Sequence, residues 1–258
     1  MTIPQPLKGC VAVVTGAGTG LGLGIAQRLA NAGADIAVVE INQTTGIAAA
    51  AAIGELGVHS RVYQTNVANS DEVNSTIQSI VSDFGAIDVL VNNAGISRIG
   101  PHTQNVTDED WLDCIAVMQT GVFYCMRAAG QVMITQGRGS IVNVSSIRGF
   151  SPTPGRMTYS PAKAAVIMMT KIAAGEWAPH GVRVNAVAPG FCRTPMHDEQ
   201  VARGAFAEDH YLRTIPVGRF GTPDEVGALV VYLSSDDASY VTGACFVIDG
   251  GLTTIAGG

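Results

Sequence analysis

The sequence predicts one α/β domain with a doubly wound parallel sheet of seven strands and helices on both faces. Short apolar runs alternate with helix-like segments along all 258 residues. The apolar runs are continuous rather than alternating with polar residues, as expected for strands covered on both faces. Right-handed crossovers between such strands give a doubly wound arrangement. No linker or break in composition divides the chain, so we expect residues 1–258 to form a single domain.

Each predicted strand is a short apolar run that ends at a glycine or a polar residue. The first run, "CVAVVTG", is rich in β-branched residues and stops at a glycine, which is typical of a buried strand. The seven runs cover residues 10–16, 35–40, 61–67, 87–95, 140–146, 182–190 and 244–251.

The segments between the strands carry helix start signals. "TDED" (107–110) matches a capping box, and "TPDE" (222–225) adds a proline at the first helical position. The segment 71–84 is entered at Ser70 and has acids in its first turn. The other predicted helices cover residues 23–33, 44–56, 108–133 and 158–178. The long insertion at 191–221 leaves the carboxyl edge of the sheet, so we expect it to be a lid over a ligand.

The bulk composition argues against several classes of protein. The net charge of −6 lacks the basic footprint of a nucleic-acid-binding protein. No uncharged apolar run reaches the roughly 18 residues that span a bilayer, and we expect no secretion signal. The cysteines are five in number, an odd count, and lie without CxxC pairs, which indicates free thiols in the cytoplasm. The five histidines show no ligand spacing, so we assign no metal.

A glycine-rich loop, "TGAGTGLG" (15–22), follows the first strand and opens the first helix. Glycines let a backbone approach a pyrophosphate closely, and a helix N-terminus attracts its charge. The strand–turn–helix context favours nucleotide binding over a structural turn.

Glu40 ends the second strand, where an acid accepts hydrogen bonds from ribose hydroxyls and repels a 2′-phosphate, which favours NAD over NADP. The alternative is an exposed acid at a strand end.

The spacing of these glycines resembles that of the short-chain dehydrogenases/reductases. The resemblance continues in order through "NNAG" (92–95), Ser146, "YSPAK" (159–163), "PGFCRTPM" (189–196) and "TGACFVIDGG" (242–251). It covers essentially residues 7–252. It implies a Rossmann-type sheet with strand order 3-2-1-4-5-6-7 and an NAD(H)-dependent oxidoreductase that interconverts a secondary alcohol, such as a polyol, hydroxy acid or cyclic alcohol, and its ketone. It also implies a homodimer or homotetramer in which the helices at 108–133 and 158–178 pair across subunits.

The same resemblance assigns the catalytic residues Ser146, Tyr159 and Lys163. Tyr159 would be the general acid/base, although a free phenol has a pKa of about 10. Lys163 lies one helical turn away, and its ammonium is expected to lower the pKa of Tyr159. Pro161 is expected in the first turn of this helix, where its missing N–H costs least. Ser146 would hydrogen-bond the substrate oxygen; the alternative is a serine that only caps a strand end.

Residue chemistry and resemblance together give a set of expected cofactor-binding residues. They are Gly16, Thr19, Gly20, Leu21, Gly22, Glu40, Asn66, Val67, Asn92, Ala94, Gly95, Tyr159, Lys163, Pro189, Gly190, Cys192 and Thr194. Two positions depart from the family pattern. Asn66 stands where an adenine-contacting aspartate is usual, and Met118 stands where an asparagine is thought to hold a water in a proton path. A thioether cannot donate a hydrogen bond, so Met118 favours an alternative: an NAD-binding protein of this fold with weak or no catalysis.

The substrate-binding residues are predicted from the fold as Arg98, Ser146, Arg148, Arg156, Phe191 and Met196. A guanidinium at Arg148, two residues after Ser146, could dock a carboxylate, sulfonate or phosphate, which leads to the hypothesis of an anionic alcohol or ketone. The alternative is that these arginines pair with acids on loops or across a subunit contact. An isomerase or dehydratase of the same family is a further reading, but the active-site substitutions it usually brings are not seen.

Overall fold

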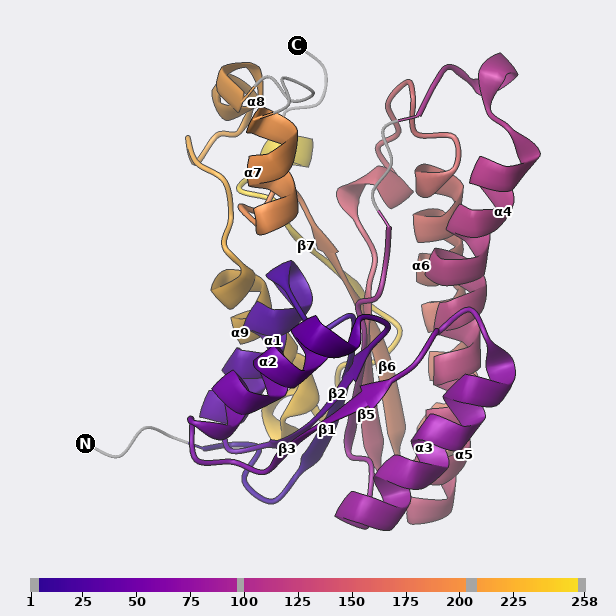
Figure 1. Ribbon diagram of the computed structural model, residues 1–258, viewed down its shortest axis with the longest axis vertical. Coiled ribbons are helices and arrows are strands. Elements are labelled where there is room, and N and C mark those ends of the chain that lie inside the picture. Colours follow the sequence, from indigo (N-terminus) through magenta and orange to yellow (C-terminus); the bar gives the residue numbers. More distant parts are fainter. Residues whose placement is uncertain (1–4, 97–99, 203–207, 255–258) are drawn as a thin grey trace.

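The computed structural model describes residues 5–96, 100–202 and 208–254. Its centre is a seven-stranded parallel sheet with the order β3-β2-β1-β4-β5-β6-β7, which confirms the predicted fold class and strand order (Figure 1). The strands are β1 (Val11–Thr15), β2 (Asp35–Glu40), β3 (Ser60–Gln64), β4 (Val89–Asn92), β5 (Gly139–Val144), β6 (Val182–Pro189) and β7 (Cys245–Ile248).

Helices cover both faces of this sheet (Figure 1). Successive β1 residues alternate between the two cores: Ala12 and Val14 pack on one side, and Val11 and Val13 on the other. This is why the strand has no polar face. One layer holds α1 (Gly20–Asn31), α2 (Gln43–Gly54) and α9 (Pro223–Ser234), and the other holds α3 (Ser70–Phe84), α5 (Gly121–Gln136) and α6 (Tyr159–Trp177).

The predicted helix over 108–133 is interrupted in its middle. It consists of α4 (Asp108–Ile115), a π-helical turn η2 (Ala116–Thr120) and α5. A π turn widens the helix locally and re-aims the side chains within it. The turn contains Met118, which is fully buried. The sequence signals did not reveal this turn, because all five of its residues are compatible with an ordinary α-helix.

The start of α3 differs by one residue from the prediction. Asn69, rather than Ser70, is the N-cap, because its side-chain oxygen accepts hydrogen bonds from the backbone N–H groups of Asp71 and Glu72. The other two predicted caps are confirmed: Thr107 caps α4, and Thr222 forms a capping box with Glu225 at α9.

Two further helices lie within the insertion after β6, namely α7 (Pro195–Ala202) and α8 (Glu208–Thr214). They stand beyond the carboxyl ends of the strands, at the top of Figure 1. Short 3₁₀ turns complete the chain: η1 (Thr103–Asn105), η3 (Ile147–Gly149), η4 (Ala178–His180), η5 (Asp236–Ala238) and η6 (Leu252–Thr254).

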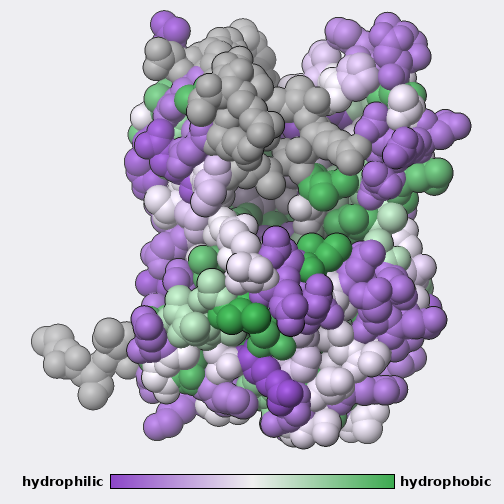
Figure 2. Space-filling view, in the orientation of Figure 1, coloured by the Kyte–Doolittle hydropathy of each residue, from purple (hydrophilic) through white to green (hydrophobic). Residues whose placement is uncertain are grey.

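The surface is mostly hydrophilic in the view of Figure 2, with hydrophobic groups in a few places, including the side where α4 lies. Trp111 and Leu112 are the exposed large apolar residues of that helix.

None of the described helices is long and apolar enough to cross a bilayer. The five cysteines all fall within the described ranges and form no disulfide. Across these ranges, no three His, Cys, Asp or Glu side chains gather as a metal-binding group.

Candidate active site

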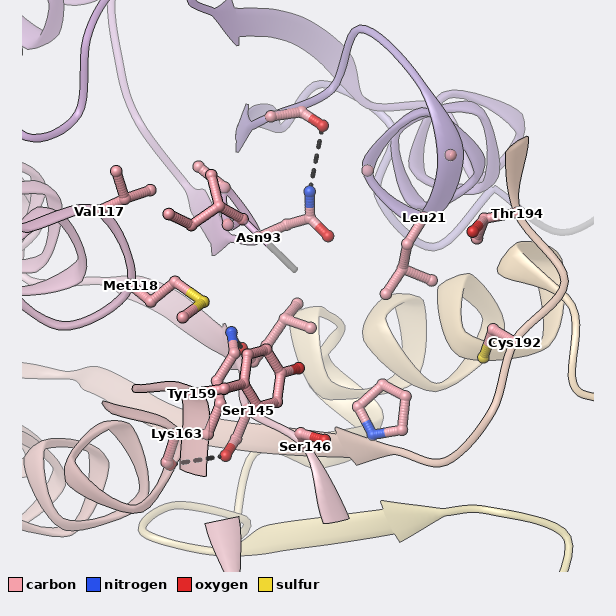
Figure 3. Close-up of a pocket in the computed structure, with 18 of the residues that line it drawn as sticks. Leu21, Asn93, Val117, Met118, Ser145, Ser146, Tyr159, Lys163, Cys192 and Thr194 are labelled. Carbon is pink, nitrogen blue, oxygen red and sulfur yellow. Dashed lines mark hydrogen bonds between the residues drawn. The ribbon is translucent and has the colours of Figure 1, made fainter. Parts of the chain in front are cut away.

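A cavity of about 490 Å³ opens at the carboxyl edge of the sheet, and its volume is in the range typical of cofactor and small-molecule sites. The order of the strands reverses between β1 and β4, where ligands of doubly wound sheets bind. The wall of the cavity comes from the loop between β1 and α1, from the ends of β2, β4, β5 and β6, and from the start of α6. In Figure 3, Tyr159, Lys163 and Ser146 face Leu21, Thr194 and Cys192 across the cavity.

The glycine-rich loop is packed so closely that side chains could not replace its glycines. Gly16 has a φ of +64°, and a Cβ on it would lie 2.9 Å from the Cα of Ala94. A Cβ on Gly22 would lie 2.1 Å from the carbonyl oxygen of Gly16. Asn93 fixes the loop from the neighbouring strand, because its Nδ2 donates to the carbonyls of Thr15 (2.9 Å) and Gly16 (3.1 Å). The loop is therefore held in one shape beside the cavity.

The N-terminus of α1 fits a phosphate group. Its N-cap residue, Thr19, makes no side-chain capping hydrogen bond, so the hydroxyl does not occupy the N–H groups of the first turn. Thr19, Gly20 and Leu21 all line the cavity. Exposed N–H groups and the positive end of a helix form a site for an anion, so these residues suit the pyrophosphate of a dinucleotide.

Glu40 closes the same end of the cavity. One of its carboxylate oxygens accepts a hydrogen bond from the N–H of Gly18 (3.0 Å), and the other accepts one from the N–H of Asn42 (3.1 Å). These bonds fix the carboxylate at the end of β2, beside the glycine-rich loop. A fixed, partly exposed carboxylate can accept hydrogen bonds from hydroxyl groups and repels a phosphate.

Ser146, Tyr159 and Lys163 come together on the other side of the cavity. Ser146 is the second residue after the end of β5, and Tyr159 is the first residue of α6. The Ser146 hydroxyl lies near enough to Tyr159 to lower the pKa of the phenol. Lys163 lies one turn further along α6, with its Nζ 5.8 Å from the centre of the Tyr159 ring. Pro161 is the third residue of α6 and so lies in the first turn, as predicted.

Opposing influences set the pKa of Tyr159. Burial raises the pKa, whereas the hydrogen bond from Ser146 and the positive charges of Arg156 and Arg148 lower it. That the ammonium also lowers the pKa of Tyr159 stays a prediction for Lys163. Its Nζ donates a hydrogen bond of 2.8 Å to the carbonyl oxygen of Val144 and lies over the Tyr159 ring.

Lys163 itself is buried, and burial lowers its pKa from 10.5 to about 8. An unfolded chain keeps this proton up to about pH 10.5, so the stability of the wild type rises between pH 8 and pH 10 relative to a variant without the amine. We therefore expect the unfolding free energy of the wild type, measured relative to that of Lys163→Met, to increase by about 2 to 3 kcal/mol between pH 8 and pH 10. Urea unfolding at pH 7.5 and pH 10 measures the shift, and a difference independent of pH would contradict it.

Met118 forms an apolar wall beside the tyrosine. It packs with Cys114, Ala162 and Tyr159, and its Sδ would lie 3.6 Å from a Cβ built on Gly95. The thioether therefore contributes to the burial that raises the pKa of Tyr159 and offers no proton to a relay.

Nearly all of the predicted cofactor residues line the cavity, and Asn92 is the exception. Asn92 is 2% exposed, and its Nδ2 donates to the side chain of Asn143, its neighbour on β5. The next residue, Asn93, lines the cavity in its place. Asn66 lines the cavity as expected, while its side-chain oxygen accepts a hydrogen bond from the N–H of Ala68. The lining residues that the sequence did not indicate include Thr65, Val117 and Val144.

Three of the predicted substrate residues, Arg148, Arg156 and Phe191, line the cavity near Ser146. Arg98 lies outside the described residues, and the side chain of Met196 is likewise outside the described part of the chain. Val117 could have been anticipated only from its adjacency to Met118.

Known proteins match the chain over almost its whole length. A family model described as enoyl-(acyl carrier protein) reductase matches residues 16–253. A 3-oxoacyl-(acyl-carrier-protein) reductase of Thermotoga maritima is 40% identical over 95% of this chain and 98% of its own length. A 2,5-dichloro-2,5-cyclohexadiene-1,4-diol dehydrogenase of Sphingobium indicum is 36% identical over 96% of this chain and 99% of its own.

Solved structures agree with these matches. The crystal structure of NAD⁺-bound xylitol dehydrogenase superposes with a TM-score of 0.90 at 34% identity, covering 95% of this chain and 99% of that one. With its parallel sheet, its glycine-rich loop and its serine, tyrosine and lysine at one cavity, the chain belongs to the short-chain dehydrogenases/reductases, a family of oxidoreductases that bind a nicotinamide cofactor.

Proposed function

We propose that the protein is an NAD(H)-dependent oxidoreductase that interconverts a secondary alcohol and its ketone, with Tyr159 as general acid/base. The observation that carries this proposal is that one cavity is lined both by the N-terminus of α1 and by Ser146, Tyr159 and Lys163. The named dehydrogenases among its relatives, a diol dehydrogenase and a xylitol dehydrogenase, support an alcohol as substrate.

The side chains divide the chemistry between them. A nicotinamide bound in the cavity supplies or accepts the hydride. Tyr159 donates its proton to the carbonyl oxygen during reduction and takes it back during oxidation. Ser146 hydrogen-bonds the same oxygen and stabilises the charge that develops on it. Burial raises the pKa of Tyr159 and so keeps the phenol protonated near neutral pH, which favours reduction of a ketone.

We assign the preference for NAD(H) to Glu40. Its carboxylate is fixed beside the loop by two backbone hydrogen bonds. The cations that line the cavity, Arg148, Arg156 and Lys163, all follow β5 in the sequence and none comes from the β2 end. A 2′-phosphate would therefore meet a negative charge there with no compensating cation among the described lining residues.

We expect Glu40→Gln to raise kcat/KM with NADPH relative to NADH by at least about tenfold, because the substitution removes like-charge repulsion and keeps the side-chain shape. Steady-state kinetics with both cofactors measures the ratio. Glu55→Gln is the matched control, since Glu55 is an exposed acid at the end of α2 that does not line the cavity. A wild-type enzyme that already prefers NADPH would contradict the assignment.

The activity itself is tested by following NADH absorbance with a panel of polyols, hydroxy acids, cyclic alcohols and the corresponding ketones. Turnover of any of them supports an oxidoreductase. The buried thioether of Met118 favours one competing function, a dinucleotide-binding protein with little catalysis. Tight NADH binding without turnover of any panel member would support that function instead.

We further propose that the protein is cytoplasmic and forms a homodimer or a homotetramer. Exposed apolar side chains on α4, α5 and α6 suit subunit contacts, namely Leu112, Phe123, Met168 and Ile172. We also propose that residues 1–258 act as one domain with a substrate lid at about 191–221. In this segment Arg193 forms ion pairs with Asp198 of α7 and Glu208 of α8, which link the two helices.

A further inference from the structure

Arg148 is tied to the catalytic serine through the backbone. It lies in the 3₁₀ turn η3, which begins directly after Ser146, and its N–H donates a hydrogen bond of 3.1 Å to the Ser146 hydroxyl oxygen. Its guanidinium lines the cavity, donates to the carbonyl oxygen of Ser151 (3.1 Å) and stacks over the ring of Phe191 at 5.7 Å. The backbone hydrogen bond therefore fixes Arg148 next to Ser146, the residue that would hold the substrate oxygen.

Arg156 is linked to the catalytic residue Tyr159 by a backbone hydrogen bond. Its carbonyl oxygen accepts hydrogen bonds from the N–H groups of Tyr159 (3.1 Å) and Ser160 (2.9 Å), the first two residues of α6. Its guanidinium also lines the cavity and lies 5.8 Å from the centre of the Tyr159 ring. Two cations thus flank the reacting hydroxyl groups, on elements that do not carry the glycine-rich loop.

Among the side chains that the structure describes, no acid balances the charge of Arg148. None of the carboxylates among them forms an ion pair with this guanidinium. Burial and the like charge of Arg156 both lower the pKa of Arg148, which means that the folded protein disfavours this charge. A partly buried guanidinium beside a second cation raises the free energy of the folded protein unless an anion binds to it.

We propose that Arg148 and Arg156 form an anion subsite, so that the substrate is a compact secondary alcohol or ketone that carries a carboxylate or a phosphonate-like group. This inference rests on the proposed function, because it places the anion next to the carbon that Tyr159 and Ser146 serve. A guanidinium presents a planar pair of N–H donors that matches such an oxyanion. Binding the anion here would bring the alcohol or carbonyl oxygen of the same molecule to the two hydroxyl groups.

A bound anion would also change the pKa of Tyr159. Both arginines lower the pKa of Tyr159, whereas burial raises it, and the surrounding groups include Cys114, Ser146 and Lys163. An anion on the arginines would offset their charge and keep the phenol protonated. This is the state that donates a proton to a ketone.

The test compares each anion with its uncharged ester. The ketone probes are acetoacetate with methyl acetoacetate, and acetonylphosphonate with its dimethyl ester, each assayed with NADH. We expect the wild type to show a kcat/KM for at least one anion that exceeds that of its ester by about 10- to 100-fold. The pair with the larger ratio identifies the anionic group. In Arg148→Gln this ratio should fall close to one, and in Arg148→Lys, which keeps the charge without the planar fork, it should be intermediate.

Lys8→Gln is the matched control. It removes one positive charge from an exposed residue before β1, at the opposite edge of the sheet, and should leave the ratio unchanged. Equal efficiency for anion and ester in the wild type, or an unchanged ratio in Arg148→Gln, would overturn the proposal. So would a loss of NADH affinity in Arg148→Gln as large as the loss of anion preference, because the arginine would then serve the cofactor.

Binding is measured separately from turnover, by titration calorimetry of acetoacetate and acetonylphosphonate into the NADH-saturated protein. We expect at least one to bind the wild type and to bind Arg148→Gln about tenfold more weakly or worse. If neither anion binds, the subsite is refuted whatever the activity. If an anion binds through Arg148 but no ketone is reduced, the subsite stands and the proposed oxidoreductase activity fails.

Discussion

We expect the Tyr159→Phe variant to lose about 10²- to 10⁴-fold in kcat while keeping its affinity for NADH. Phenylalanine fills the same space against Met118 and Ala162 but has no proton to donate. The reacting oxygen of the substrate therefore loses both its acid and one of the two hydroxyl groups that would hydrogen-bond it, and keeps only Ser146. Stopped-flow measurement of NADH consumption, together with NADH fluorescence titration, separates chemistry from cofactor binding.

Tyr63→Phe is the matched control for this experiment. Tyr63 lies on β3, its hydroxyl donates to Asp83 at 2.6 Å, and it does not line the cavity. We expect this variant to keep the wild-type kcat and to lose only the stability of one exposed hydrogen bond. A Tyr159→Phe variant with an undiminished kcat would show that another group moves the proton.

The second large effect is expected for Ser146→Ala, with a loss of about 10²- to 10³-fold in kcat, as found when one donor to a developing oxyanion is removed. The hydroxyl also accepts a hydrogen bond from the N–H of Arg148 and lowers the pKa of Tyr159. Because the hydrogen bond from Ser146 lowers the pKa of Tyr159, its loss should also move the pH profile of alcohol oxidation to higher pH. Rates measured between pH 6 and pH 10 report both effects.

Ser140→Ala tests whether any serine on this strand has the same effect. Ser140 lies at the opposite end of β5, and its buried hydroxyl donates to the carbonyl oxygen of Leu233 at 2.9 Å. Its loss should lower stability by about 1 kcal/mol and leave the pH profile in place. If Ser146→Ala behaves like Ser140→Ala, Ser146 is a structural residue at a strand end.

Local sequence patterns were sufficient to predict most of the fold. The continuous apolar runs predicted the parallel strands, because a strand covered on both faces has no polar side. Thr107 and Thr222 predicted helix starts correctly, since capping depends on residues only three positions apart. The π turn at Ala116–Thr120 was not predictable, because helix propensity does not distinguish an α turn from a π turn.

The sequence by itself determined which side chains could carry the chemistry: Tyr159 and Lys163 on one helical face and Ser146 at a strand end. Tertiary structure decided how these groups are oriented and which charges reach them. Asn93 rather than Asn92 faces the cavity, because Asn92 lies within the sheet opposite Asn143, 51 residues away. Lys163 bonds the carbonyl of Val144, and Arg156 lies as near the Tyr159 ring as Lys163 does. Such contacts join segments that are distant in the chain, so their geometry depends on how the whole sheet and its helices pack.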